Sequence, residues 1–243
     1  MLSLKKGRYA ARLADCAGDV EAAQRLRHLS FLGGEGRDAD AFDDICAHVL
    51  VEEIKTGRLV CCFRLLPLSD GNEIGRSYSA QYYELSALRD FRGPMVEMGR
   101  FCIYPDVRDP DILRVAWGAM TRYVDENGVE MLFGCSSFHG TDEREYLDAF
   151  ALLKERHLAP KRWLPRVKAP QVFRFAQKLR GKPDAKQAML RMPPLLRTYL
   201  LMGGWVSDHA VVDPAMNTLH VFTGLEIKAI PPARKRLLRG VAG

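Results

Sequence analysis

The order of extended and helical patterns along the chain predicts an α/β or α+β fold. Two strongly apolar runs, 95–104 and 129–136, are typical of buried strands, and a helical pattern separates them. Two strands joined by such a helical crossover pair in parallel, with a right-handed connection. With 243 residues, 47% of them hydrophobic and 27% charged, the chain can bury a substantial core. We therefore expect one domain, residues 1–243, built on a sheet.

The N-terminal part predicts a short strand, a helix and a hairpin. Residues 9–13 are expected to be extended, and residues 19–31 carry apolar side chains on one helical face before a Gly-Gly stop. After an acidic loop, residues 48–54 and 59–66 read as two strands joined by a Thr-Gly turn. Pro67 is expected to close the second strand.

The middle of the chain carries the clearest helix signal. The strand at 95–104 is expected to end at Pro105. Asp109 followed by Pro110 predicts a capped helix start, because Asp favours the cap position and proline the first helical position. The helical pattern then continues to Gly128.

The remaining elements alternate in the same way. The strand at 129–136 precedes a helix expected at 141–157, whose first turn is acidic. A C-terminal portion, residues 190–230, is expected to contain a short helix at 193–202 and a final strand at 218–227.

Cysteine and histidine spacing predicts no metal site. The six cysteines contain no CxxC pair, and the six histidines show no HxH, HxxxH or HExxH spacing. We expect reduced, structural thiols, as in cytosolic chains. No apolar run approaches the roughly 20 residues of a membrane span, and the N-terminus lacks an export signal, so the expected location is the cytoplasm.

The net charge of +6 conceals a strong asymmetry. Residues 1–150 hold 18 Lys and Arg against 25 Asp and Glu, whereas residues 151–243 hold 18 against 5. Most of the excess lies in residues 151–181, the basic segment, whose only acid is Glu155. Its candidate surface residues are Lys154, Arg156, Lys161, Arg162, Arg166, Lys168 and Arg174. The segment fits nucleic acid, an anionic membrane surface or an acidic carrier protein, and it also fits a solvated face without a partner.

Three charged residues stand inside apolar strand patterns. Arg64 lies in CCFRLLP, and Glu97 and Arg100 lie in MVEMGRFCI. Buried charges are costly unless they are paired, so these residues either form internal ion pairs or line a site. Side chains three apart on a regular strand face opposite sides, and a bulge at Gly99 would break that alternation.

These residues belong to a pattern that resembles a known family. The pattern is Arg27-x3-Phe31, Asp40-x2-Asp43, GRLVCCFRLLP and Glu97-x2-Arg100-Phe101. Over residues 25–105 it is similar to the autoinducer (acyl-homoserine-lactone) synthases. Nearly the full length, through EIGRSYSAQYY, VEMGRFCI, DPDILRVAWGA, LFGCSSFHG and PPLLRTYLLMGG, looks more like the ornithine lipid N-acyltransferases.

The resemblance implies a GCN5-related N-acetyltransferase fold. That fold is a mixed sheet with splayed central parallel strands, flanked by helices, here with a basic C-terminal extension. The implied reaction moves a 3-hydroxyacyl group from acyl carrier protein to the α-amine of L-ornithine, giving lyso-ornithine lipid. The usual phosphate loop of the superfamily is missing, and three aspartates stand at 104–112 near a helix N-terminus that would otherwise suit the pyrophosphate of coenzyme A. We expect no separate cofactor, because the acyl group arrives on the phosphopantetheine arm of the carrier.

The resemblance also implies catalytic roles on one strand. Glu97 is the expected base, acting directly or through a water. Its task is modest, because an α-amine has a reference pKa of about 7.7 to 8.0, against about 10.4 for a side-chain amine. Strand amides between Phe101 and Tyr104 are expected to hold the thioester carbonyl.

Further residues are expected to bind the amino acid. Arg64 and Arg100 suit its carboxylate, and Asp40 or Asp43 its δ-ammonium. The other substrate-binding candidates are Arg27, Phe31, Phe101 and Ser136.

Two alternatives stay open beside this function. One is an acyl-homoserine-lactone type signal synthase with the same fold. The other is a non-enzymatic module whose basic segment binds nucleic acid or another anionic surface. Few aromatic residues interleave the basic ones and no nucleic-acid motif is present, so we expect no nucleic-acid partner. The basic segment is assigned instead to acyl carrier protein or to peripheral contact with the anionic inner face of a membrane.

Overall fold

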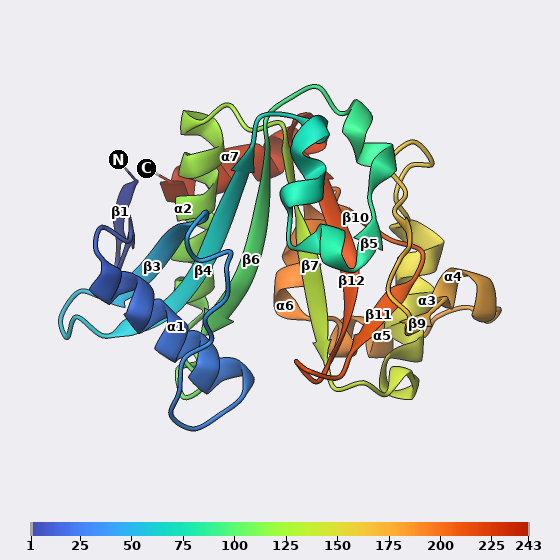
Figure 1. Ribbon diagram of the computed structural model, residues 1–243, viewed down its shortest axis with the longest axis horizontal. Helices are drawn as coiled ribbons and strands as arrows, with labels where there is room; N and C mark the ends of the chain where they lie inside the picture. The colour runs from blue at the N-terminus through green and yellow to red at the C-terminus, as the bar shows by residue number, and fades with distance from the viewer. Residues whose placement is uncertain (1, 243) are drawn as a thin grey trace. The chain divides into compact units, whose positions relative to one another are not determined.

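The computed structural model describes residues 2–242, which form two compact units (Figure 1). Unit 1 contains Met1–Pro67, Met98–Val129 and Pro231–Gly243, and unit 2 contains Leu68–Glu97 and Glu130–Ile230. Each unit combines segments that are distant in sequence, so no linker composition marks a boundary. The chain passes from unit 2 to unit 1 inside strand β6 (Met95–Ile103). Folding as one domain stays a prediction.

Unit 1 is a sheet with helices packed on it. Strands β1 to β4 are antiparallel neighbours in chain order, and β6 lies beside β4. The elements are β1 (Ser3–Lys6), β2 (Tyr9–Leu13), α1 (Ala17–Phe31), β3 (Ala47–Glu53), β4 (Leu59–Leu68), the later part of β6, α2 (Pro110–Glu126) and α7 (Pro232–Ala242). In Figure 1, α1 crosses in front of β3 and β4, and α2 stands behind them. On the α1 side, Ala23 and Leu26 pack against Leu50, Cys62 and Cys102.

The two long helices of unit 1 begin close to the positions that the sequence predicts. The carboxylate of Asp109 accepts a hydrogen bond from the amide of Asp111, and Pro110 is the first residue of α2. The helix expected at 19–31 begins two residues earlier, at Ala17. Both helices are therefore specified by local sequence.

The hairpin expected at 48–54 and 59–66 is confirmed as β3 and β4. At its turn the amide of Gly57 donates to the carbonyl oxygen of Glu53. Strand β4 continues through Pro67 to Leu68, so the expectation that the proline closes it is wrong. A proline fits an extended backbone wherever the strand needs no amide donor.

Unit 2 is built on a long antiparallel pair of strands, β7 (Met131–His139) and β12 (Thr218–Glu226). Strands β11 (Ala210–Asp213) and β9 (Val172–Phe173) extend the sheet beyond β12. On the other side of β7, the residues Met95 to Glu97 of β6 pair in parallel with Met131 to Phe133. The predicted parallel neighbours are confirmed, and the sheet is mixed.

Shorter elements surround this pair. They are the 3-10 helices η1 (Gly71–Arg76), η2 (Ser79–Gln81), η3 (Ser86–Asp90), η4 (Glu143–Tyr146) and η5 (Ile227–Ala229), the helices α3 (Leu147–Arg156), α4 (Phe175–Lys178), α5 (Ala185–Arg191) and α6 (Pro194–Leu201), and the strands β5 (Tyr83–Glu84), β8 (Arg166–Val167), β9 (Val172–Phe173), β10 (Trp205–Val206) and β11 (Ala210–Asp213). The helix expected at 141–157 is divided between η4 and α3, and the helix expected at 193–202 is α6. Most of the others are too short to show a period in sequence.

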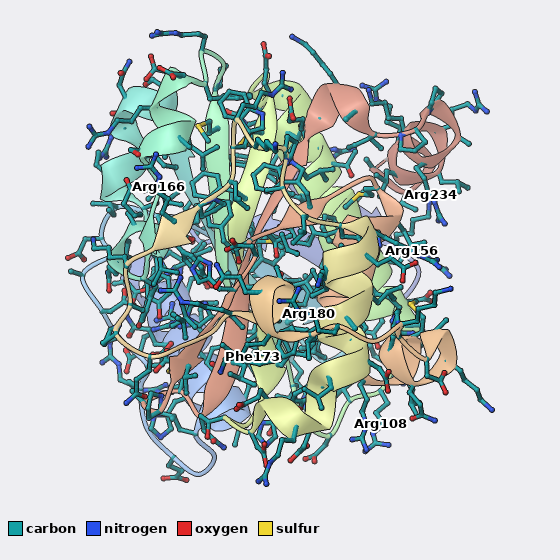
Figure 2. The ribbon with its side chains drawn as sticks, turned by 90° about the vertical axis from the view of Figure 1, so that its right-hand side faces the viewer. Arg108, Arg156, Arg166, Phe173, Arg180 and Arg234 are labelled. Carbon is teal, nitrogen blue, oxygen red and sulfur yellow. The ribbon has the colours of Figure 1, made fainter. Side chains whose placement is uncertain are left out.

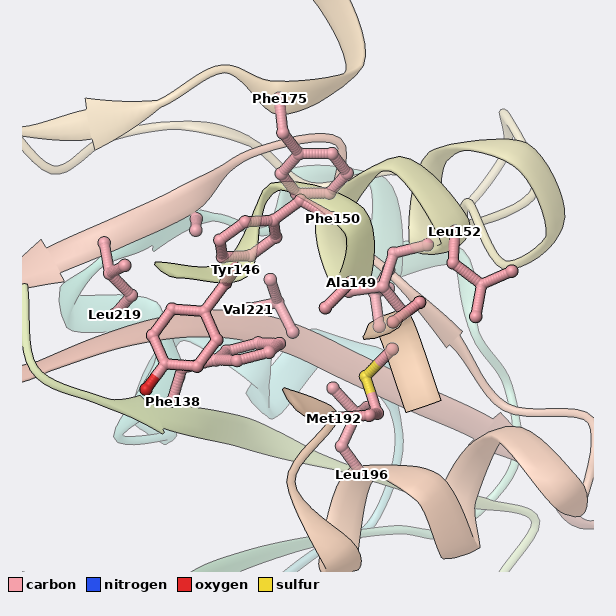
Figure 3. Packing of buried hydrophobic residues seen from close by; sticks show 14 of the residues in the cluster. Phe138, Tyr146, Ala149, Phe150, Leu152, Phe175, Met192, Leu196, Leu219 and Val221 are labelled. Carbon is pink, nitrogen blue, oxygen red and sulfur yellow. The ribbon is translucent and has the colours of Figure 1, made fainter. Parts of the chain in front are cut away.

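Helices α3 to α6 supply the core on one face of the unit 2 sheet (Figure 3). Phe138, Leu219 and Val221 come from β7 and β12, and they pack with Phe150 of α3 and Leu196 of α6. All five are at most 1% exposed. Because side chains alternate along a strand, Cys135 of β7 lies on the opposite face, where the loop carrying η2 packs.

Candidate active site

Glu97 is buried in unit 2 with three hydrogen-bond donors on its carboxylate. Its Oε2 accepts the amide of Tyr78 at 2.7 Å, and its Oε1 accepts the amide and the hydroxyl of Ser79 at 2.8 and 2.6 Å. Glu97 is only 4% exposed. A buried carboxylate persists where such bonds replace its hydration. Donors from one short loop therefore hold this carboxylate in a fixed orientation.

Ser79 connects this carboxylate to the neighbouring strand. The Ser79 hydroxyl that donates to Glu97 lies 3.4 Å from Sγ of Cys135 on β7. Ser136, the next residue, lies on the opposite face of the sheet, where it is buried and accepts a hydrogen bond from the Thr223 hydroxyl at 2.9 Å. The fold therefore places the two sequence candidates of unit 2, Glu97 and Ser136, on opposite faces, and the substrate role of Ser136 stays a prediction.

In unit 1 three arginines and three aspartates form a closed ring of alternating charge, which we call the charge ring. In order around the ring its members are Arg27, Asp38, Arg100, Asp40, Arg64 and Asp43. Each side chain contacts one opposite charge on either side. The fold thus brings together the candidates from α1, β4, β6 and the acidic loop, and it adds one aspartate that the motif did not include.

The links of the charge ring differ in strength. Arg27 donates to both oxygens of Asp43 at 2.7 and 2.9 Å, and Arg64 donates to both oxygens of Asp40 at 2.6 and 2.8 Å. The longest link joins Nη2 of Arg100 to Oδ2 of Asp40 at 3.3 Å. Bidentate pairs are the strong ones, so the link between Arg100 and Asp40 costs least to open.

Burial divides the same ring into an interior and a rim. The side chains of Arg27, Arg64 and Asp43 are 1%, 4% and 5% exposed, whereas those of Arg100 and Asp40 are 14% and 25% exposed. Interior members can act on a bound molecule only through the rim. Asp38 lies between the two sets at 11%. Arg100 and Asp40 are therefore the most exposed members of the ring and form its rim.

Two carboxylates of the charge ring, those of Asp43 and Asp40, are ionised at neutral pH. Burial raises the pKa of Asp43, but hydrogen bonds from Arg27 outweigh it and hold this pKa well below its usual range. Burial also raises the pKa of Asp40, and the contact with Arg64 again reverses the shift, so the net change is downward. Beside them, burial lowers the pKa of His48. The ring is thus balanced in charge, and the imidazole next to it is neutral.

Arg100 has an unusual backbone for a strand residue. Its φ is 53°, in the left-handed region that non-glycine residues avoid. Regular alternation along β6 therefore ends at this residue, one position after Gly99, where the sequence left a bulge open. Such a conformation costs roughly 1 to 3 kcal/mol, and two ion-pair contacts of the Arg100 guanidinium, to Asp38 and Asp40, accompany it here.

The strand amides near the end of β6 are partly occupied. The amide of Tyr104 donates to the carbonyl oxygen of Val60 at 2.8 Å, so its expected role as an oxyanion donor is wrong in this structure. The preceding amides stay candidates. The aromatic candidates have packing partners, since Phe101 stacks on Phe63 with ring centroids 5.5 Å apart and Phe31 packs against the core beneath α1.

Sequence reasoning missed two residues that complete these arrangements. Asp38 bridges Arg27 and Arg100, and its spacing to Asp40 in RDAD was the available signal. Ser79 stands in the EIGRSYSAQYY stretch that supports the resemblance, but that stretch does not indicate a partner of Glu97, because the contact joins residues 18 positions apart and uses a backbone amide as well as the hydroxyl. Contacts of that kind appear only after folding.

The basic segment lies in unit 2, and Figure 2 labels Arg156 and Arg166 from it on the face turned to the viewer. Six of its seven candidates are exposed, and the seventh, Lys154, is half-buried and donates to the carbonyl oxygen of Leu179 at 2.6 Å. Arg162 pairs with Glu226 at 3.3 Å, and Arg166 lies 3.9 Å from Glu84. Lys161 and Arg174 are exposed, and the described part of the chain gives neither an acidic partner. These two are therefore the best probes of an external partner.

The N-terminus of α2 is occupied by a carboxylate of the chain itself. Asp109 caps the first turn and also accepts hydrogen bonds from the Tyr9 hydroxyl, at 2.9 Å, and from Arg8. Because helix N-termini bind anions through free amides and a positive dipole end, this cap competes with a phosphate there. The arrangement agrees with the missing phosphate loop.

One group of metal-type ligands lies on the surface of unit 1. Ligand atoms of Asp15, Cys16 and Asp19 all lie within 4.8 Å of one another. The carboxylate of Asp19 already accepts hydrogen bonds from both terminal nitrogens of Arg12 and from the amide of Asp15. An internal ion pair accounts for this group, and we assign no metal to it.

Fold comparisons define the class of the protein. The model of the acetyltransferase (GNAT) domain matches residues 27–118. The N-acyl amino acid synthase FeeM from uncultured soil microbes superposes with a TM-score of 0.52 at 12% identity, covering 91% of this chain and 92% of that one. The CoA-dependent acyl-homoserine lactone synthase BjaI superposes with a TM-score of 0.50 at 16% identity, covering 93% and 83%. The chain has the mixed, helix-flanked GNAT fold.

Sequence comparison identifies the family. The L-ornithine N(alpha)-acyltransferase of Rhodobacter capsulatus is 36% identical over 238 residues, which cover 91% of each chain. The protein of the same name from Rhizobium meliloti is 30% identical over 241 residues, covering 90% of this chain and 80% of that one. The chain belongs to the L-ornithine N(alpha)-acyltransferase family. Among residues 2–242, no helix combines the length and the apolar character that crossing a bilayer requires.

Proposed function

We propose that the protein transfers a 3-hydroxyacyl group from acyl carrier protein to the α-amine of L-ornithine, giving lyso-ornithine lipid. The observation that carries the proposal is the buried Glu97 carboxylate, which accepts three hydrogen bonds from Tyr78 and Ser79. The names of the relatives, which specify the α-nitrogen of ornithine, support the acceptor. The reaction forms an amide C–N bond and breaks the thioester C–S bond.

Glu97 acts as the base of this transfer, directly or through a water. The α-amine must lose a proton to attack the thioester, and its reference pKa of about 7.7 to 8.0 makes that easier than at the δ-amine. The tetrahedral intermediate collapses with release of the pantetheine thiolate, which takes up a proton. Amides of β6 before Tyr104 stabilise the oxyanion. No covalent enzyme intermediate is needed, so positioning supplies most of the acceleration.

The rim of the charge ring suits an amino acid that carries charges of both signs. Arg100 receives the carboxylate, and Asp40 receives the δ-ammonium. Such a substrate replaces the longest link of the ring, at 3.3 Å, with two new ion pairs, so no ionised group is left unpaired. Arg64 and Asp43 act as positioning residues, because they hold the rim from positions that solvent barely reaches.

We expect the carrier thioester to be the better donor. With L-ornithine, kcat/KM for 3-hydroxyacyl carrier protein should exceed that for the matching coenzyme A thioester by about tenfold or more, equivalent to about 1.4 kcal/mol. The physical reasons are the Asp109 cap on α2 and the exposed basic segment. Release of free thiol measures the rate, and tandem mass spectrometry locates the acyl group on the α-nitrogen.

A third acyl donor, the acyl phosphopantetheine without carrier or nucleotide, separates the effect of the Asp109 cap from that of the basic segment. Its kcat/KM should fall to the level of the coenzyme A thioester if the carrier surface provides the advantage. Equal or faster turnover of the coenzyme A thioester would refute the donor assignment. Acylation of the δ-nitrogen would refute the acceptor assignment.

Reversing charge in the basic segment should weaken carrier binding. We expect Lys161→Glu with Arg174→Glu to raise KM for acyl carrier protein several-fold and to weaken its salt dependence, while kcat at saturation stays nearly unchanged. Both residues are exposed and distant from the carboxylate of Glu97 in sequence. Steady-state kinetics at low and moderate salt measure the effect.

The matched control makes the same change in net charge outside the basic segment. Lys5→Glu with Lys55→Glu alters two exposed lysines of unit 1 and should leave the carrier KM unchanged. The same segment could serve an anionic lipid surface, where each basic residue contributes about 1 kcal/mol. An unchanged carrier KM together with release of the double variant from anionic vesicles in sedimentation would replace carrier docking by membrane contact.

A further inference from the structure

Two buried histidines of unit 2 lie among tyrosines on the sheet face that carries Cys135. His220 of β12 is 3% exposed, and His209, just before β11, is 0% exposed. The ring centroid of Tyr83 lies 5.6 Å from that of His220 and 5.2 Å from that of His209. Tyr82 meets His220 edge to face at 5.0 Å. Neither imidazole has a role in the mechanism above.

The contacts of Tyr83 determine which nitrogen of His220 carries its proton. The single hydroxyl proton of Tyr83 is donated to the carbonyl oxygen of His220 at 2.8 Å. The same hydroxyl oxygen lies 3.1 Å from Nδ1 of His220, so Nδ1 is protonated and donates to it. Burial lowers the pKa of His220 to about 4, which keeps the ring neutral. Nε2 is then a bare acceptor.

This acceptor has no donor within the described residues. Nε2 of His220 is buried and without a hydrogen-bond partner there, and so is Nε2 of His209, whose Nδ1 lies 2.6 Å from Asp208. A buried acceptor without a hydrogen-bond donor destabilises the fold, so its presence in a native protein indicates a function such as ligand binding. A donor from outside the chain, such as a hydroxyl group, satisfies it.

The two histidines differ in access. His220 is covered by the edge of Tyr82, which is half-buried and thus reaches the surface, whereas His209 is fully enclosed beside Tyr83. The side chains that contact His220 are aromatic, since Tyr82 and Tyr83 lie against its ring. On the same sheet face Phe222 stacks on Phe133 with ring centroids 5.8 Å apart. An apolar chain that carries one hydroxyl matches this combination.

We propose that Nε2 of His220 accepts a hydrogen bond from the 3-hydroxyl of the acyl chain. This proposal rests on the proposed function, and it names the residue that selects acyl thioesters with a 3-hydroxyl group. His220 pairs with Ser137, four residues along β7 from the partner of Glu97, which is about 13 Å along the strand. A water on Glu97, the amine, the thioester carbon and C3 together bridge that span. An acyl thioester without the hydroxyl leaves Nε2 unpaired and is therefore a poorer substrate.

His220→Asn tests the assignment with little change of shape. The amide nitrogen of the new side chain takes the place of Nδ1 and keeps the donor to Tyr83, while the acceptor at Nε2 is removed. We expect the ratio of kcat/KM for 3-hydroxydecanoyl carrier protein to that for decanoyl carrier protein to fall about fivefold to tenfold. The fall should come from the hydroxylated donor, with turnover of the plain donor nearly unchanged.

His209→Asn is the matched control, because it removes another buried Nε2 that has no hydrogen-bond partner among the described residues and keeps the contact with Asp208. In this control, the ratio of kcat/KM for the hydroxylated carrier substrate to that for the plain one should equal the wild-type ratio. An unchanged ratio in the folded His220→Asn variant, or a fall only in the control, overturns the proposal.

A second measurement does not depend on turnover. In protein with nitrogen-15 histidine, the resonance of His220 Nε2 should move when 3-hydroxydecanoyl-pantetheine is added and stay in place with decanoyl-pantetheine. A resonance that ignores the hydroxylated probe overturns the proposal. Absence of transfer from every carrier substrate would defeat the proposed function instead, and the resonance would still decide the hydroxyl contact.

Discussion

Glu97→Gln is expected to lower kcat about 100-fold near pH 7, within the range for loss of a general base. The glutamine keeps the size of the side chain but has a single acceptor oxygen, so it accepts from the amide of Tyr78 or from that of Ser79 and not from both. Its amide cannot take a proton from the amine. The loss should shrink as the pH rises toward 9, because a growing share of the α-amine is then neutral without a base. Initial rates at saturating substrate between about pH 6 and pH 9 measure both effects.

Two further variants make this result specific. Glu130→Gln removes a carboxylate of the same unit that pairs with Lys228, and it should keep wild-type kcat. Ser79→Ala removes one of the three donors to Glu97 and should lower kcat by a smaller factor, about tenfold, with KM nearly unchanged. Wild-type kcat in folded Glu97→Gln protein would leave this carboxylate a structural role only.

Asp43→Asn is expected to destabilise the protein by about 3 kcal/mol at pH 7. Asp43 is the interior carboxylate of the charge ring, and it accepts from Arg27, Arg64 and Gln24. Removing one partner of a buried ion pair leaves the others uncompensated, which costs roughly 3 to 5 kcal/mol. Urea unfolding followed by circular dichroism measures the free energy of unfolding.

The same carboxylate predicts the acid sensitivity of the protein. The pKa of Asp43 is lower in the folded chain than the value of about 3.9 in the unfolded chain, because the contact with Arg27 overcomes the effect of burial. Its contribution to stability is therefore fully present well above about pH 4 and is lost as the pH falls toward the folded pKa. We expect a steep loss of stability below about pH 4 in the wild type and a shallower one in Asp43→Asn.

Asp111→Asn provides the control for both measurements. Asp111 is exposed and forms a surface pair with Arg114, three residues away on the same helix, so its loss should change stability by no more than about 0.5 kcal/mol. Equal free energies of unfolding for Asp43→Asn and Asp111→Asn would contradict the prediction that the charge ring stabilises the fold.

Much of the fold follows from local patterns. The strands of the hairpin, the parallel pair of β6 and β7, and the capped helix α2 were predictable because each carries a periodic run or a cap within about 20 residues. The short strands β8 to β11 and the helices α4 and α5 were not, because two to seven residues form no period and depend on their neighbours in the sheet. Pro67 shows the same limit, since its place at the end of β4 depends on which amides need partners.

The candidate site divides in a similar way. The sequence alone singled out Glu97, Arg64 and Arg100 as charges embedded in apolar strands, and burial of all three side chains to differing degrees agrees with that prediction. It did not reveal which partners they have. The partners of Glu97 are two backbone amides and a hydroxyl, and no residue type signals an amide donor.

The sequence by itself determined the class of fold, the family and the presence of charges where apolar residues were expected, because periodicity, motif and composition are local properties. Only the tertiary structure decided that two of those charges, Arg64 and Arg100, close a ring with Arg27 and three aspartates, that Arg100 and Asp40 are its most exposed members, and that His220 holds an unpaired acceptor. The contacts that decide these points join residues 16, 60 and 137 positions apart. Which distant groups meet, and which are left without a donor, is set by packing of the whole chain, since the energy of a buried polar group depends on its partners and not on its own identity.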